Sequence, residues 1–311
     1  YHHSGTYYGY PYSNIEVLNS PITPRENWIR FVTGGDYEWI PDCVADVYDI
    51  TPDANPDAIA CGFEGGIDTL GVEWVPCGNP DLPSMVKPGS PKLQDICDWR
   101  EVLEFPDVDS WDWEAMRAGY DESVAEGRFV RGVVYSGFFE RLISLMDFEE
   151  AAVSLLVEPE ETRALFERLA DLNISIIEHY AECLHVDGVM VHDDWASQTM
   201  PFFSEEAARE VVLPPYKRMV DRVRELGLLF TAHCCGCAID RIPIMIEAGV
   251  QSWQLQPDAA NPALAAAKAG AAVKLEPTGV APEIKDYDEL EAYIAELGFD
   301  ALRKHMRRIK K

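Results

Sequence analysis

Short apolar runs alternate with longer amphipathic segments along the chain from about residue 129. The runs at 129–137, 186–194 and 228–236 are expected to be β-strands, and 252–257 and 271–277 continue the series. None alternates strictly between polar and apolar residues, which is typical of parallel strands buried on both faces. Helical patterns occupy the intervening segments, at 158–184, from Ser204 towards Gly227, at 238–249 and at 261–270. These repeated strand–helix units predict an α/β fold with a parallel sheet.

Proline, serine and glycine mark the ends of the expected helices. Pro159, followed by acidic residues, is typical of the first turn of a helix. Ser204 is a favourable N-cap for the next helix, which Pro214 and Pro215 are expected to bend or interrupt. Gly249 closes the helix at 238–249.

Polar residues recur where the expected strands end. They are Asp193, Asp194, His233, Cys235, Gln254, Gln256 and Glu276. In a closed barrel these strand ends meet at one mouth, whereas a doubly wound open sheet would spread them along an edge. We therefore expect a (β/α)8 TIM barrel and treat residues 1–311 as one barrel domain.

The N-terminal third has a different pattern. Residues 61–99 are rich in glycine and proline with short β-like pieces, which indicates a β-hairpin elaboration between early barrel elements. Residues 1–30 are expected to hold a tail and the first helix. The aromatic tail has three interpretations: cover for the barrel mouth, contact with a second copy in a homo-oligomer, or a disordered terminus.

Charge and cysteine usage narrow the function classes. The chain has 26 basic and 54 acidic residues and a formal net charge of −28, which argues against nucleic acid or an anionic membrane as a partner. The basic run 303–311 is interpreted as a helix C-terminus. No apolar run approaches the ~20 residues that span a bilayer, and the first residues lack a secretory pattern. Eight cysteines in such a chain are typical of a reducing, cytoplasmic compartment.

The segment "TAHCCGC" (231–237) concentrates candidate chemistry at one strand end. His233 and Cys235 are two residues apart, so both side chains should face the mouth and could form half of a tetrahedral zinc site. Cys234 should point to the helix layer as a core residue, and Cys237 is undecided. Two alternatives remain open: buried cysteines beside a hydrogen-bonded histidine, and a redox pair in the C-x-x-C of Cys234 and Cys237.

A second cluster, "HDDWASQ" (192–198), follows the strand before it. His192 and Asp194 should share a face opposite to Asp193. A carboxylate here could orient a substrate, act as acid or base, or complete a metal shell, while loop solvation and helix capping are the structural alternative. Glu276 closes a later strand and has the same two interpretations, and Glu64 and Asp68 are weaker candidates.

These motifs resemble the uroporphyrinogen decarboxylase superfamily of (β/α)8 barrels. The most specific segments are "HDDWASQTMPFFSEEAAREVVLPPYKRMVDRVRELG" (192–227) and "HCCGCAIDRIPIMIEAGVQSWQLQP" (233–257). "GIDTLGVEWV" (66–75) and the residues that follow it are similar to the hairpin and linker of the corrinoid-dependent methyltransferase branch. The resemblance implies zinc on His233 and Cys235. Methylcobamide:coenzyme M methyltransferases of that branch take a third ligand from a distal cysteine, but no cysteine follows Cys237 here, so Glu276 or an acid of "HDD" is expected instead.

The leading hypothesis is therefore a methyltransferase. The resemblance implies transfer of a methyl group from a small donor to the cobalt of a separate corrinoid protein, and a methoxylated aromatic is the expected donor. Zinc on His233, Cys235 and Glu276 would act as a Lewis acid that stabilises the departing phenolate. Asp194 and Gln198 would orient the donor or the metal shell. Trp195 and Trp253 would supply an aromatic lining.

Three alternatives belong to other classes. A porphyrinogen decarboxylase predicts no metal and a basic pocket, but the chain lacks the arginine-rich N-terminal motif of true uroporphyrinogen decarboxylases. Its net charge of −28 is also unfavourable for a substrate with many carboxylates. Methylcobamide-to-thiol transfer is the second alternative. The third is a non-enzymatic barrel that binds a corrinoid or tetrapyrrole.

Overall fold

The computed structural model covers the predicted strand–helix region almost completely. It describes residues 21–39, 41, 43, 46–50, 62–79, 83–118, 127–257 and 259–276. It also gives the backbone of four two-residue strands near the N-terminus, β1 (His2–His3), β2 (Thr6–Tyr7), β3 (Tyr10–Pro11) and β4 (Ile15–Glu16). The tyrosine side chains of the tail and the basic run 303–311 lie outside the described residues.

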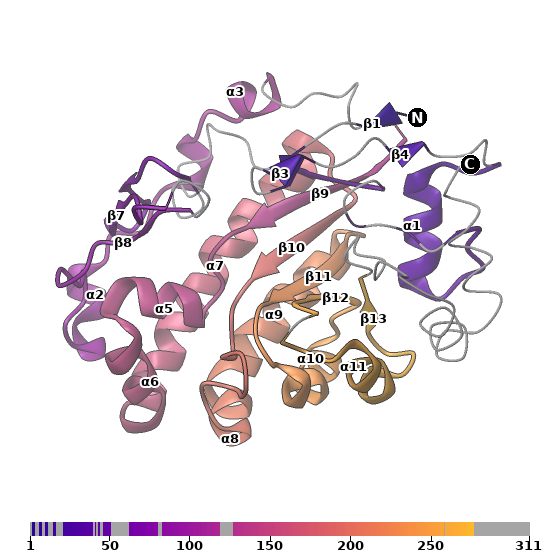
Figure 1. Ribbon diagram of the computed structural model, residues 1–311. Helices are drawn as coiled ribbons and strands as arrows, with labels where there is room; N and C mark the ends of the chain where they lie inside the picture. Colours follow the sequence, from indigo (N-terminus) through magenta and orange to yellow (C-terminus); the bar gives the residue numbers. More distant parts are fainter. Residues whose placement is uncertain are drawn as a thin grey trace.

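A six-stranded sheet forms the centre of the described fold (Figure 1). Its order is β13 (Lys274–Leu275), β12 (Ser252–Leu255), β11 (Leu229–Cys234), β10 (Gly188–His192), β9 (Phe129–Val134) and β5 (Val47–Ile50). All neighbouring pairs are parallel. Every residue of β9, β10 and β12 is buried, as expected for strands covered on both faces. The five predicted strands are thus confirmed, each somewhat shorter than its apolar run.

One ion pair shows that this sheet is strongly curved. Arg131 lies in β9, and its guanidinium is 2.9 Å from the carboxylate of Glu276, which follows β13. Three strands separate β9 from β13 in the sheet, so a flat arrangement would put them roughly 19 Å apart at about 4.8 Å per strand. The two side chains meet because the sheet curves round and both point into its interior. This curvature agrees with the predicted (β/α)8 barrel class.

Helices pack against the outer face of the sheet. The longest are α7 (Pro159–Leu184) and α9 (Leu213–Glu225), followed along the chain by α10 (Ile242–Ala248) and α11 (Pro262–Ala269) (Figure 1). The helix starts and stops follow the predicted signals. Pro159 begins α7, and Gly249 ends α10 with a left-handed φ of 88°.

The helix that begins after Ser204 is irregular, as its two prolines predict. The Ser204 hydroxyl accepts the Ala207 N–H and caps α8 (Glu205–Ala207), and a π-helical turn (Ala208–Val212) joins α8 to α9. Pro214 and Pro215 lie in the first turn of α9, where their missing N–H groups leave helix hydrogen bonds unformed. The wider π turn takes up this interruption one turn before the prolines.

The N-terminal elaboration is a three-stranded antiparallel sheet, one strand more than the predicted hairpin. Its strands are β6 (Gly66–Ile67), β7 (Glu73–Val75) and β8 (Met85–Val86). Asp68 ties this sheet to the barrel, since its buried carboxylate accepts the Arg141 guanidinium of α5 (Phe139–Met146) at 2.8 Å and the Trp74 indole N–H. Asp68 therefore has a structural role.

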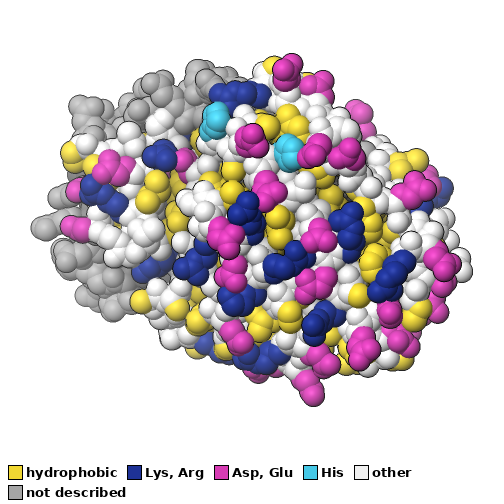
Figure 2. Space-filling model, turned by 180° about the vertical axis from the view of Figure 1, so that it is seen from behind, with side chains coloured by type: hydrophobic (Ala, Val, Ile, Leu, Met, Phe, Trp, Pro, Cys, Tyr) yellow, Lys and Arg dark blue, Asp and Glu magenta, His cyan; other side chains and the backbone are white. Residues whose placement is uncertain are grey.

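The outer helices carry interleaved charges of both signs (Figure 2). Arg218 of α9 pairs with Glu167 and Asp171 of α7, and Arg222 pairs with Glu178. Exposed pairs of this kind contribute only about 0.2–1 kcal/mol each, so they mainly keep the face polar. None of the described helices is both long and apolar enough to cross a membrane.

Candidate metal and substrate site

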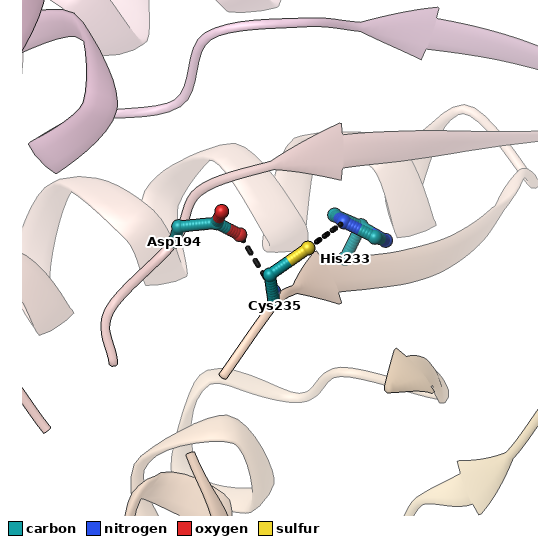
Figure 3. Close-up of side chains that lie close together, drawn as sticks. All are labelled: Asp194, His233 and Cys235. Atoms are coloured by element: carbon teal, nitrogen blue, oxygen red, sulfur yellow. Dashed lines mark hydrogen bonds between the residues drawn. The ribbon is translucent and has the colours of Figure 1, made fainter. Parts of the chain in front are cut away.

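Asp194, His233 and Cys235 converge at the C-terminal ends of β10 and β11 (Figure 3). One ligand atom from each lies within 4.8 Å of the other two. His233 is the second-last residue of β11, Cys235 directly follows the strand, and Asp194 lies in the loop after β10. The structure therefore brings together the predicted pair, His233 and Cys235, with one acid of the "HDD" motif.

Strand register explains why these residues meet. In the parallel pair β10–β11, His192 is opposite His233, so Asp194 comes to lie beside Cys235. The Cys235 N–H donates to Asp194 Oδ1 at 2.6 Å, which leaves the second carboxylate oxygen for a ligand. Further along, the Cys237 N–H donates to the Ser197 carbonyl at 2.7 Å. The two loops thus hold each other in position before any ligand binds.

A glycine is required where these loops approach most closely. Gly236 has a φ of +75°, and a Cβ atom there would lie 2.2 Å from the Ala196 carbonyl oxygen. Its N–H donates to Gln256 Oε1 at 2.8 Å, and the Gln198 amide contacts the same oxygen at 3.1 Å. Gln198, an expected catalytic residue, is exposed in the structure and linked to Gln256 instead of to the three-residue cluster.

Gln254 determines which nitrogen of His233 is available. His233 Nδ1 lies 2.8 Å from Gln254 Oε1, and an amide oxygen only accepts, so Nδ1 carries the proton. The lone pair is then on Nε2, which faces Cys235 Sγ at 3.2 Å. Burial lowers the pKa of His233, although Asp194 and Gln254 act in the opposite direction. A neutral imidazole with a defined tautomer is the form that binds metal.

The geometry fits a zinc ion. Zinc binds histidine nitrogen at 2.0–2.1 Å and thiolate sulfur at 2.3 Å, so tetrahedral angles imply about 3.5 Å between the two ligand atoms. The observed separation of 3.2 Å between Nε2 and Sγ is close to that value. Asp194 adds an oxygen donor, and three protein ligands leave one position for substrate, as in catalytic zinc sites.

His192 lies directly against this cluster. Its ring stacks on the ring of His233 with centroids 4.1 Å apart and planes at 26°. The side chain is 7% exposed, and its Nε2 has no hydrogen-bond partner among the described residues. Burial, with smaller contributions from His233 and Arg131, lowers the pKa of His192 well below its usual value. His192 is therefore neutral.

Asp193 points away from the cluster, as the strand alternation predicts. Its carboxylate accepts the N–H groups of Phe138 and Glu140 at the start of α5 and the Trp195 indole N–H at 2.8 Å. Burial raises the pKa of Asp193 to about 6, although these hydrogen bonds oppose the shift. Burial also raises the pKa of Glu140 well above its usual value, with added repulsion from Asp194 and Asp193.

The structure places Glu276, the expected third ligand, outside the cluster. Its buried carboxylate accepts both Arg131 hydrogen bonds at 2.9 Å and the hydroxyl groups of Thr231 and Ser252. These partners occupy its oxygens. Asp194 stands beside His233 and Cys235 in its place.

Both tryptophans expected to line the substrate site are core residues. Trp195 is 1% exposed and packs on Tyr216 with ring centroids 5.2 Å apart, and Trp253 is 0% exposed. Indoles with so little accessible surface offer no face to a ligand, so the structure corrects this expectation. Cys234 is buried, as predicted for a residue facing the helix layer. Gln254 and His192 are the neighbours of the cluster that the site hypothesis did not include.

Comparisons with known proteins bear on the family and the fold. Residues 128–276, which contain the whole cluster, match the model of the family described as Uroporphyrinogen decarboxylase (URO-D). A solved structure, a methyltransferase from Methanosarcina mazei, superposes with a TM-score of 0.61 at 13% identity, covering 91% of this chain and 90% of that one. At that identity the likeness establishes the fold alone. No curated protein matches the chain. The segment that carries the candidate site, residues 128–276, is thus a uroporphyrinogen decarboxylase (URO-D) family domain.

Proposed function

We propose that the protein is a methyltransferase that moves a methyl group from a methoxylated aromatic to the cobalt of a separate corrinoid protein. The observation that carries the proposal is the cluster of Asp194, His233 and Cys235 at the C-terminal ends of parallel barrel strands, where such folds place their chemistry. The family match and the fold shared with a methyltransferase support it. Asp194, His233 and Cys235 would hold zinc.

A bound zinc ion would supply Lewis acidity to the ether oxygen as the methyl group departs. The residues of the chain prepare this chemistry. Gln254 keeps His233 Nδ1 protonated, so that Nε2 is free to bind, and the Cys235 N–H fixes the orientation of Asp194. The ion pair of Arg131 and Glu276 is fully buried inside the barrel.

A matched pair of cysteine variants tests the metal site. Cys235 Sγ belongs to the cluster, whereas the Cys237 side chain, two residues away in the same loop, does not. We expect wild-type protein to bind about one equivalent of zinc, Cys235→Ser to lose most of it, and Cys237→Ser to keep it. Less than a tenth of an equivalent in carefully prepared wild type would refute the metal site.

A methyl-transfer assay then tests the reaction. Purified protein is mixed with a Co(I) corrinoid protein and a panel of methoxylated aromatics, and methylation of cobalt is followed by its absorption spectrum. We expect turnover that depends on Cys235 but not on Cys237. Turnover only with a methyl-corrinoid and a thiol would reassign the protein to the methylcobamide-to-thiol alternative. Zinc binding without any turnover would favour a binding protein.

The charges at the mouth disfavour a porphyrinogen as substrate. Asp194 places a carboxylate there, beside His233 and Cys235. Arg131 reaches the barrel interior, but its guanidinium is already paired with Asp49 and Glu276. A substrate with several carboxylates would be repelled by the Asp194 carboxylate, and the Arg131 guanidinium is not available to bind it.

A further inference from the structure

His192 is a buried polar residue for which the fold provides no complete set of partners. It ends β10, in register with His233 on the neighbouring strand, so both imidazoles point to the same side of the sheet. The His233 ring stacks on it at 4.1 Å, and the Tyr135 ring lies 5.4 Å away at 57°. These rings fix the plane of the imidazole by packing.

The unpaired atom of His192 is Nε2, which is buried and makes no hydrogen bond within the described part of the chain. A buried polar atom without a partner is destabilising, and such atoms are rare in folded proteins. An apolar ring at position 192 would pack against the His233 ring equally well, so packing does not explain why the residue is a histidine. A ligand that completes the hydrogen bond would offset this cost, and the metal ligand His233 is the adjoining ring.

We propose that His192 is a specificity-determining residue of the methyl-transfer site, and that its Nε2 hydrogen-bonds a polar atom next to the ether oxygen of the donor. The inference rests on the proposed function for the identity of the ligand. A neutral imidazole nitrogen either donates or accepts one hydrogen bond. A hydroxyl group can accept in the first case and donate in the second. Because the His192 ring stacks on the His233 ring, a hydroxyl group bonded to His192 would lie close to an ether oxygen held at the cluster. The donor class is therefore an aromatic ring with a hydroxyl group beside its methoxy group.

Calorimetric titration of zinc-loaded protein with 2-methoxyphenol and with methoxybenzene tests this directly. One hydrogen bond of about 0.5–1.5 kcal/mol corresponds to a preference of roughly twofold to twelvefold for the hydroxylated ligand in wild type. His192→Phe keeps an aromatic ring against His233 but removes both nitrogens, so both ligands should bind equally. His192→Gln restores a polar atom and should recover part of the preference. Zinc content should be the same in all three proteins.

Three results would overturn the proposal. These are equal binding of the two ligands by wild type, binding of neither ligand, and a preference that persists in His192→Phe. Loss of zinc from His192→Phe would also count against it, since His192 would then act through the metal. If His192→Phe does not fold, His192→Leu serves for the same comparison. The methyl-transfer assay tests the proposed function separately. If that function is wrong, the ligands can still bind in the titration, but no methylation of cobalt follows.

Discussion

The ion pair inside the barrel allows the sharpest quantitative prediction. Arg131 and Glu276 both have side chains that are 0% exposed, and they connect β9 to the end of β13. Burial lowers the pKa of Arg131, but Asp49 and Glu276 outweigh it and hold the pKa well above its usual value. The guanidinium is therefore charged. Arg131→Met removes this charge and leaves the Glu276 carboxylate without a counterion.

The expected cost follows from what each partner retains. Breaking a buried pair by removing one partner costs about 3–5 kcal/mol, because the remaining charge is uncompensated. Glu276 would keep two hydroxyl hydrogen bonds, and Asp49 is 24% exposed and can be hydrated. We therefore expect the lower part of that range, about 3 kcal/mol, for Arg131→Met. In Glu276→Gln the loss should be smaller, because Arg131 still pairs with Asp49.

Urea unfolding followed by tryptophan fluorescence measures these free energies. The double variant Arg131→Met with Glu276→Gln removes both charges, so its cost should be well below the sum of the two single changes. A coupling energy of about 0.5–3 kcal/mol is typical of contacting residues. A loss below about 1 kcal/mol for Arg131→Met would refute the reasoning. So would additivity of the single changes within about 0.5 kcal/mol.

Three further predictions concern the site. Gln254→Leu should weaken zinc binding about 10–100-fold in a chelator competition, because His233 loses the acceptor that sets its tautomer; unchanged affinity would argue against that role. Gly236→Ala should lower stability by about 1 kcal/mol or more and reduce zinc content, since a Cβ would lie 2.2 Å from a carbonyl oxygen; a neutral result in thermal melting would contradict the loop geometry. Asp193 has a folded pKa of about 6 against 3.8 in the unfolded chain, so the folded state holds the proton more tightly and its contribution is lost as pH rises between these values. That loss amounts to about 3 kcal/mol, and metal-free Asp193→Asn should show less of it between pH 4 and 6; the same pH slope in both proteins would exclude Asp193 as its source.

Local signals in the sequence were sufficient for five of the six strands of the central sheet, all but β5, and for the helix ends. Strand burial on both faces leaves continuous apolar runs, and helix ends depend on residues within one turn, such as Pro159 and Gly249. Both features can be read without knowing any distant contact. The alternation of side chains along a strand likewise placed His233 with Cys235 and turned Cys234 to the core.

The third member of the cluster depended on tertiary structure. Asp194 and Glu276 both follow barrel strands, and the sequence offered no reason to prefer one. The register of β10 against β11 places Asp194 beside Cys235, while the curvature of the sheet brings Arg131 to Glu276. Neither the register nor the curvature is encoded within a few residues of these acids.

The same distinction explains the tryptophans and His192. Aromatic residues near a strand end can line a pocket or fill the core. The packing of Tyr216 on Trp195, which the sequence does not reveal, shows that Trp195 is a core residue. His192 shared the predicted face of Asp194, yet its significance depends on a stacked neighbour and an unpaired nitrogen. The sequence by itself determined the order of elements and the face on which the chemistry lies, because both follow from local periodicity. Tertiary structure alone decided which side chains meet there, because those contacts join residues far apart in the chain.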